Sequence, residues 1–145
     1  MIAQRKVDVV WEGDLLNGNG RVRFNSGAIP EFPVSWAARV EQPGGKTSPE
    51  ELLAGAHASC YSMALSATLA RNRTPPQRLQ VSAVCTLDKV GEANKITKME
   101  INVVGRVPGI NQQQFEELAK TAESRCPVSN ALRNNVEIVL GAKLE

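Results

Sequence analysis

Two cysteines and one histidine are the residues of this chain whose types and spacing best suit chemistry. His57 precedes Cys60 by three residues, so in a helix both side chains lie on one face, about one turn apart. Such a pair can act as a nucleophile with its base, or supply half of a metal site. Cys126 stands directly before Pro127, where the start of a helix would favour its thiolate form. From spacing alone two ordinary alternatives stay open: Cys60 as a packed side chain and His57 as a hydrogen-bonded core residue.

The third cysteine, Cys85, has the pattern of a packed strand residue. It alternates with apolar side chains at residues 79, 81, 83 and 87, which share one face of an expected strand. Three widely separated cysteines match neither a disulfide-rich secreted scaffold nor paired zinc motifs. The first residues alternate valine with polar side chains, where a signal peptide has a continuous apolar stretch. We therefore expect a cytoplasmic protein, in which a disulfide would be catalytic or redox-sensing.

The helix that must hold His57 and Cys60 has a clear start. Ser48 at the N-cap, Pro49 at the first helical position and Glu51 two residues further on form a capping box. Residues 52–70 then contain no Asp, Glu, Lys or Arg and are rich in Ala, Gly and Ser. Serine, threonine and histidine make this stretch too polar for a membrane span. We predict a central helix that is buried on most faces, whose small side chains allow other backbone to approach closely.

Alternating strands and two shorter helices complete the expected fold. Strands are predicted at residues 7–12, 21–25, 32–40, 79–87, 99–107 and 135–140. A second main helix starts at Asn111, with Gln114 in the capping-box position, and ends at Pro127; residues 126–132 can form a short third helix. This order predicts one α+β domain over residues 1–145, in which helices cover a mostly antiparallel sheet.

Composition limits the partners. The chain has 145 residues, and 17 Lys and Arg against 15 Asp and Glu leave a net charge of +2, with no run of basic residues. Aromatic residues are only 4%, too few for platforms on which bases stack. The turn at residues 18–20, Gly-Asn-Gly, lacks the patterns of nucleotide-binding loops. We expect no nucleic acid, no membrane, no cofactor and no metal.

Three segments together resemble one known family. Residues 48–60 read SPEELLAGAHASC, residues 126–129 read CPVS and residues 11–14 read WEGD. They resemble the osmotically inducible protein C and organic hydroperoxide resistance (OsmC/Ohr) family, and the likeness extends over essentially the whole chain. It implies the α+β OsmC-like fold, with mostly antiparallel sheets and two main helices. It also implies an intertwined homodimer with active sites at the subunit interface.

The resemblance also implies residue roles. Cys60 is then the peroxidatic cysteine, Cys126 the resolving cysteine, and Glu50 the carboxylate that holds a catalytic arginine. In the OsmC branch that arginine lies shortly before the capped helix, where this chain has Arg39. The Ohr branch takes it from an N-terminal loop, which here contains no arginine, so Arg39 is favoured and Arg21 is the alternative.

The implied activity is a thiol-dependent peroxidase that reduces organic hydroperoxides, and hydrogen peroxide more weakly, to alcohols or water. The Cys60 thiolate, stabilised by Arg39, would take one peroxide oxygen and become a sulfenic acid, and Cys126 would then close a disulfide. An external dithiol, by family expectation a lipoylated protein, would reset the enzyme. Five apolar residues are expected to wall the substrate pocket: Ile29, Phe32, Leu52, Leu53 and Met63.

Helix geometry argues for a second subunit. Glu50 and Cys60 are ten residues apart, which is roughly 15 Å along a helix axis and leaves them roughly 80° apart around it. An arginine held by Glu50 therefore does not easily reach Cys60 of the same helix. We predict a twofold dimer in which Cys60 and Cys126 of one chain work with Arg39 and Glu50 of the other.

Two other classes of protein stay open from the residues. The first is a non-enzymatic ligand- or metal-binding protein on the same fold, with Cys60 as packing and with His57 and Cys126 at a metal. The second is a cysteine hydrolase that uses Cys60 and His57.

Overall fold

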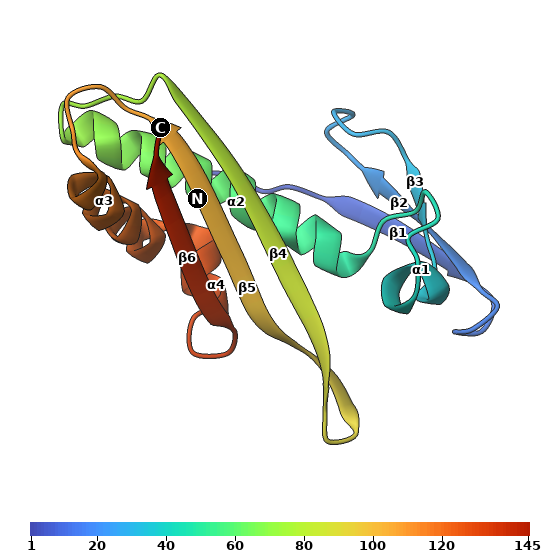
Figure 1. The fold of residues 1–145 in the computed structure, drawn as a ribbon. Helices are drawn as coiled ribbons and strands as arrows, with labels where there is room; N and C mark the ends of the chain where they lie inside the picture. Colours follow the sequence, from blue (N-terminus) through green and yellow to red (C-terminus); the bar gives the residue numbers. More distant parts are fainter. The chain divides into compact units, whose positions relative to one another are not determined.

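The computed structural model describes residues 1–145, and the chain divides into two compact units (Figure 1). The N-terminal unit comprises Met1–Leu52 and the C-terminal unit comprises Leu53–Glu145, with the boundary inside helix α2 (Pro49–Arg71). The mixed α+β class is confirmed, with two sheets and four helices. The single domain over residues 1–145 stays a prediction.

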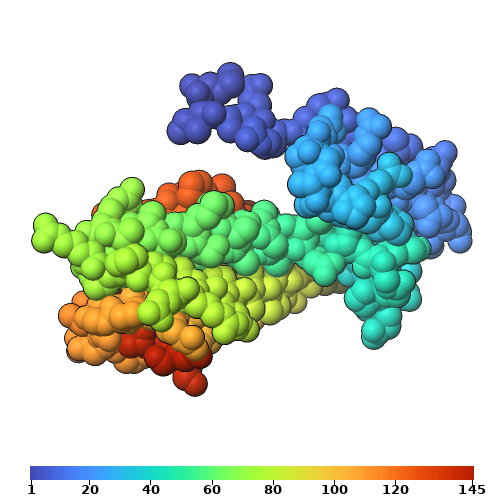
Figure 2. All heavy atoms as spheres, turned by 90° about the horizontal axis from the view of Figure 1, so that it is seen from above, coloured from blue at the N-terminus to red at the C-terminus, as the bar shows by residue number.

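The N-terminal unit contains a three-stranded antiparallel sheet. Its strands, in spatial order, are β1 (Val7–Glu12), β2 (Asn19–Phe24) and β3 (Phe32–Val34). The predicted hairpin is confirmed, because Val7 pairs with Phe24 and Glu12 pairs with Asn19. The first few residues, in the darkest blue of Figure 2, project from this unit as an exposed tail.

The expected strand at residues 32–40 is wrong beyond Val34, because the chain there turns into a short helix, α1 (Trp36–Val40). The Ser35 hydroxyl accepts a hydrogen bond from the Ala38 backbone N–H (3.3 Å), which caps the first turn. A serine N-cap with alanines at the second and third helical positions favours a helix over continued alternation. This helix carries Arg39 in its last turn.

The C-terminal unit contains a second three-stranded sheet. Its strands, in spatial order, are β4 (Arg78–Val90), β5 (Ala93–Arg106) and β6 (Glu137–Leu144). The pair β4 and β5 is antiparallel and turns at Gly91, whose φ of 62° suits glycine. Strand β6 lies parallel to β5, so the helices between them form a crossover connection.

Helices α3 (Gln112–Arg125) and α4 (Pro127–Leu132) form that crossover. The predicted capping box is confirmed: Asn111 accepts from the Gln114 N–H (2.9 Å), and the Gln114 side chain accepts from the Asn111 N–H (3.0 Å). Cys126 ends α3 and stands at the N-cap of α4, with Pro127 as its first residue. The predicted short third helix is thereby confirmed.

Helix α2 is buried on one face and exposed on the other within this chain. Tyr61, Leu65 and Leu69 are fully buried, at the three- to four-residue spacing of one helical face. On the opposite side Ser59 is exposed and Met63 is 67% exposed. Burial on most faces is therefore not achieved by one copy of the chain. Although α2 has 23 residues, no helix here has an apolar stretch sufficient to cross a lipid bilayer.

Packing between β5 and α3 makes Gly105 a sensitive position. A Cβ there would overlap the buried Phe115 ring, approaching its Cε2 to 2.7 Å, and would lie 3.3 Å from a Leu79 methyl carbon. We expect Gly105→Ala to lower the free energy of unfolding by about 1–3 kcal/mol, measured by urea denaturation. In a Phe115→Leu background Gly105→Ala is expected to lower the free energy of unfolding by less, since leucine has no ring for the added Cβ to overlap. An equal cost in both backgrounds would show that the ring is not the cause.

Candidate functional site

The two cysteines singled out from the sequence are neighbours in the C-terminal unit. Cys60 lies on α2 and is partly exposed, whereas Cys126, between α3 and α4, is fully buried. Their thiols are within hydrogen-bond reach of each other. No disulfide joins them in this structure. Two adjacent thiols, one partly exposed and one buried, can pass between a dithiol and a disulfide.

The surroundings of Cys60 act on its pKa in opposite directions. Burial raises the pKa of the Cys60 thiol, and the backbone N–H of Val128 hydrogen-bonds to its sulfur and lowers it. The neighbouring Cys126 raises it again, and the net pKa lies above the ordinary thiol value. Because the thiolate is the nucleophile, a reactive Cys60 needs a further stabilising positive charge.

The role of Val128 was not foreseen from the sequence. Proline has no backbone N–H, so with Pro127 at the first position of α4 the first free N–H of that helix belongs to Val128. The signal was the proline at the start of a helix, but which sulfur the amide would meet depends on packing.

His57 is bonded to a serine in the C-terminal unit. Its Nε2 lies 2.7 Å from Ser129 Oγ, and both residues are fully buried. Burial lowers the pKa of His57, with the charge of Glu123 acting in the opposite direction, and the ring Nδ1 is buried without a partner. His57 is thus a neutral, hydrogen-bonded core histidine. No group of three or more His, Cys, Asp or Glu side chains is placed to hold a metal ion.

Cys85 occupies the strand position expected of it. It lies on β4 opposite Met99 of β5 and packs against the apolar core of the C-terminal unit.

The N-terminal unit contains a charged pair, Arg39 with Glu50. Arg39 donates from Nη2 to Glu50 Oε1 (2.7 Å) and from Nε to the same oxygen (3.0 Å). Glu50 is only 7% exposed, and the guanidinium also lies 5.8 Å from the centre of the Trp36 ring. A carboxylate and an aromatic face together fix the orientation of an arginine while leaving part of it exposed.

Arg21, the alternative arginine, does not meet Glu50. It lies on β2, where its exposed side chain is 3.5 Å from Glu12 and 3.7 Å from Glu31. Such exposed pairs hold a side chain only weakly. Of the two arginines, the structure brings only Arg39 to Glu50.

A small, mostly apolar cavity of about 180 Å³ adjoins Arg39 in the N-terminal unit. Its walls are Trp11, Leu15, Val34, Ser35, Trp36, Arg39 and Pro49. None of the five residues expected as pocket walls lines it. One of them, Leu52, instead lines a separate apolar groove of about 410 Å³ over the sheet, with Val7, Val9, Val22, Phe24, Val34 and Pro49.

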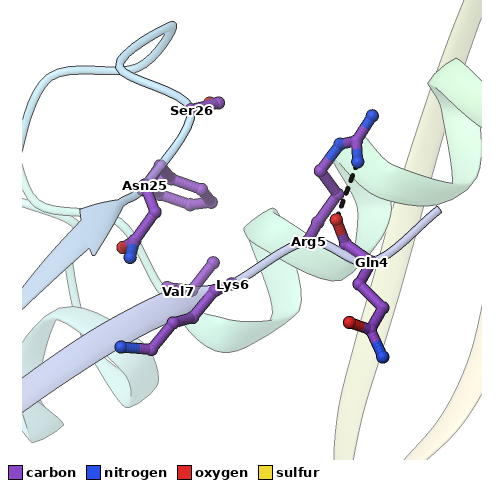
Figure 3. A pocket seen from close by; sticks show the side chains of 7 residues that line it. Gln4, Arg5, Lys6, Val7, Asn25 and Ser26 are labelled. Carbon is purple, nitrogen blue, oxygen red and sulfur yellow. Dashed lines mark hydrogen bonds between the residues drawn. The ribbon is translucent and has the colours of Figure 1, made fainter.

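A third hollow lies where the N-terminal tail meets the end of β2, and Figure 3 shows its lining. Its charged residues are already engaged: Arg5 donates to the carbonyl oxygen of Gln4 (2.7 Å), and Lys6 pairs with Asp8 (2.9 Å). None of the predicted site residues lines this hollow.

Comparison with known proteins supports one family. The family model "OsmC-like protein" matches residues 42–141. Peroxiredoxin OsmC of Escherichia coli K12 is 37% identical over 145 residues, covering 100% of this chain and 99% of that protein. Organic hydroperoxide resistance protein-like 1 of Staphylococcus saprophyticus is 29% identical over 123 residues, covering 84% of this chain and 85% of that protein.

Solved structures agree on the fold. An organic hydroperoxide resistance protein OsmC from Legionella pneumophila has a TM-score of 0.75 at 23% identity, covering 99% of this chain and 98% of that chain. OhrB of Bacillus subtilis has a TM-score of 0.73 at 21% identity, covering 95% and 98%. With a family model over most of its length and a full-length relative at 37% identity, this chain belongs to the OsmC-like protein family.

Proposed function

We propose that this protein is a thiol-dependent peroxidase that reduces organic hydroperoxides to alcohols. The observation that carries the proposal is the adjacency of the Cys60 and Cys126 thiols, with the Val128 N–H on the Cys60 sulfur. The similarity to peroxiredoxin OsmC supports a peroxide-related redox role. The reaction requires a compartment that supplies dithiols, such as the cytoplasm.

The proposed reaction has three steps. The Cys60 thiolate attacks one peroxide oxygen, the O–O bond breaks, and the alkoxide leaves as the alcohol after taking a proton; Cys60 is now a sulfenic acid. The Cys126 thiolate attacks the Cys60 sulfur, the S–O bond breaks, and hydroxide leaves as water after taking a proton. An external dithiol, such as a lipoylated protein, then reduces the disulfide and is itself oxidised.

Arg39 supplies the positive charge that Cys60 requires. It stays protonated throughout and can bind peroxide oxygens while stabilising the thiolate. Its bonds to Glu50 pre-orient it, which limits the entropy lost when substrate binds. Because Glu50 lies in the first turn of α2 and Cys60 ten residues further on, the arginine comes from a second copy of the chain.

Exposed apolar surface supports this dimer. On β1, Val9 is 59% and Val10 54% exposed, although valine suits a covered strand. One side of this small sheet carries the wholly apolar groove described above, and three-stranded sheets need cover over their apolar face. A second copy of the chain can cover both this sheet and the exposed small-residue face of α2.

The cavity beside Arg39 is suited to the organic part of the substrate. Trp11, Leu15 and Trp36 offer apolar walls, while the arginine offers donors for the peroxide group. An alkyl or aryl hydroperoxide matches this combination better than hydrogen peroxide, which has no apolar part.

Thiol mapping tests the proposed function. One equivalent of cumene hydroperoxide added to the reduced protein is expected to give a Cys60–Cys126 disulfide, with Cys85 still reactive toward alkylating reagents after unfolding. Mass spectrometry of proteolytic fragments identifies the pairing. Survival of both thiols together with tightly bound zinc would instead support the metal-binding alternative.

The pH dependence of thiol alkylation tests the role of Arg39. Burial raises the pKa of Cys60, so without a nearby cation its thiolate forms only at higher pH. We expect the iodoacetamide alkylation rate of Cys60 to reach its plateau at a lower pH in the wild type than in Arg39→Ala. In a Cys85→Ala, Cys126→Ala background Cys60 is the one thiol left to follow. Coinciding profiles would show that Arg39 does not act on Cys60.

A further inference from the structure

A hydrogen bond between two buried side chains joins α2 to α4 at the cysteine pair. His57 Nε2 lies 2.7 Å from Ser129 Oγ, and both residues are fully buried. His57 stands one helical turn before Cys60 on α2. Ser129 stands three residues after Cys126, in the first turn of α4. The bond therefore connects the two segments that carry the thiols.

Helix α4 depends on contacts of this kind because it is only six residues long. A helix of this length has no stability of its own in water, so its position is set by what it packs against. Cys126 stands at its N-cap but makes no side-chain hydrogen bond to the helix end. The Cys126 sulfur is thus not tied to its own helix. The placement of α4 on α2 fixes both this sulfur and the Val128 N–H beside Cys60.

Burying the polar His57 ring lowers the stability of the fold unless its nitrogens form hydrogen bonds. Its Nδ1 is buried without a partner, and the ring keeps one hydrogen-bonded nitrogen, on Ser129. An apolar side chain of similar volume would avoid this desolvation cost. The hydrogen bond between His57 and Ser129 is therefore better explained by fixing the position of α4 on α2 than by stabilising the fold.

We propose that His57 is a positioning residue for the resolving step, a role that rests on the proposed peroxidase function. Through Ser129 it holds α4 on α2, so that the Cys126 sulfur stays beside Cys60 when the sulfenic acid forms. In that step the S–S bond forms, the S–O bond breaks, and hydroxide leaves as water with one proton. His57 itself makes and breaks no bond.

Single-turnover kinetics with cumene hydroperoxide separate the two steps. Rapid quenching with a sulfenic-acid trap follows the formation and the decay of the Cys60 sulfenic acid. In Ser129→Ala, which removes only the hydroxyl, we expect the decay to slow about tenfold, the effect of one buried hydrogen bond, while formation slows less. Slower closure also leaves Cys60 open to a second peroxide, so its sulfinic acid should accumulate at excess peroxide.

Two substitutions at position 57 distinguish the effect of the hydrogen bond to Ser129 from the effect of side-chain volume. His57→Leu is expected to slow the decay as much as Ser129→Ala does. In His57→Gln the terminal amide reaches about as far as Nε2, so the decay rate is expected to stay within about threefold of the wild type.

Tyr61→Phe is the matched control, because Tyr61 lies on the same helix and its buried hydroxyl donates to the Ala119 carbonyl oxygen (3.2 Å) on α3. It is expected to lower the free energy of unfolding without changing the decay of the sulfenic acid. A wild-type decay rate in Ser129→Ala, or an equal slowing in Tyr61→Phe, would overturn the positioning role.

Failure of the peroxidase function itself would look different. In that case the wild type forms no Cys60 sulfenic acid with any hydroperoxide, and positioning is measured without peroxide. Equilibration in glutathione buffers gives the effective concentration of the two thiols toward each other. A value about tenfold lower in Ser129→Ala would still support the positioning role. An unchanged value would overturn it.

Discussion

Replacing Cys60 with serine is expected to lower the rate of cumene hydroperoxide consumption by a factor on the order of a thousand or more. Serine is close to cysteine in size, but its hydroxyl ionises far less readily than a thiol and is a much weaker nucleophile toward the O–O bond. Cys60 is partly exposed and bonded to the Val128 N–H, so the substitution should leave the fold unchanged. Peroxide loss measured with a dithiol reductant in excess gives the rate.

Substitutions of the other two cysteines are the controls for Cys60→Ser. Cys85→Ala removes the strand cysteine that packs against the core and is expected to keep wild-type turnover. Cys126→Ala is expected to form the Cys60 sulfenic acid at close to the wild-type rate but to accumulate it, since the resolving thiol is missing. If Cys60→Ser still consumes peroxide at the wild-type rate, the proposed chemistry is wrong.

Mixed dimers are expected to recover activity that neither parent shows. Cys60→Ser lacks the nucleophile. In Arg39→Ala the peroxidase rate is expected to fall about a hundredfold or more, because the charge that stabilises the thiolate is missing. When the two chains are co-expressed with different affinity tags and purified over both, one site of each dimer combines Cys60 with Arg39 of the partner subunit. Such dimers are expected to show about half of the wild-type rate per dimer.

The reverse pairing is the control for the subunit origin of the arginine. A chain carrying both substitutions, Cys60→Ser and Arg39→Ala, is paired with a wild-type chain in the same way. If the arginine acts on the other subunit, this dimer has no complete site and should be inactive. If it acts within its own chain, this dimer keeps half of the activity and the first pairing none. The two pairings therefore give opposite results under the two arrangements.

Local hydrogen-bonding signals made several helix boundaries predictable. The Ser48 hydroxyl accepts from the Glu51 N–H (3.1 Å), and the Asn111–Gln114 box closes in both directions, as expected from residues three apart. Pro127 likewise marks the start of α4. These signals work because the groups that satisfy each other are within one helical turn, so chain geometry alone brings them together.

The short helix α1 shows where such reasoning failed. Phe32 and Val34 alternate with Pro33 as in a strand, but the strand ends at Val34 and does not continue to Val40 as predicted. The local signal for this helix is the Ser35 N-cap with the alanines at positions 37 and 38. This difference affects the candidate site, because α1 is the element that presents Arg39 to Glu50.

The sequence by itself determined where the reactive groups sit on their elements: Cys60 in the middle of a capped, small-residue helix, and Cys126 at the junction of two helices. Only the tertiary structure decided which groups meet. The contacts between Cys60 and Val128, and between His57 and Ser129, join segments far apart in the chain. Their closure depends on how α4 packs against α2 rather than on any short-range spacing. A local pattern can specify a helix end, but the partner of a buried side chain is fixed only when the core around it is complete.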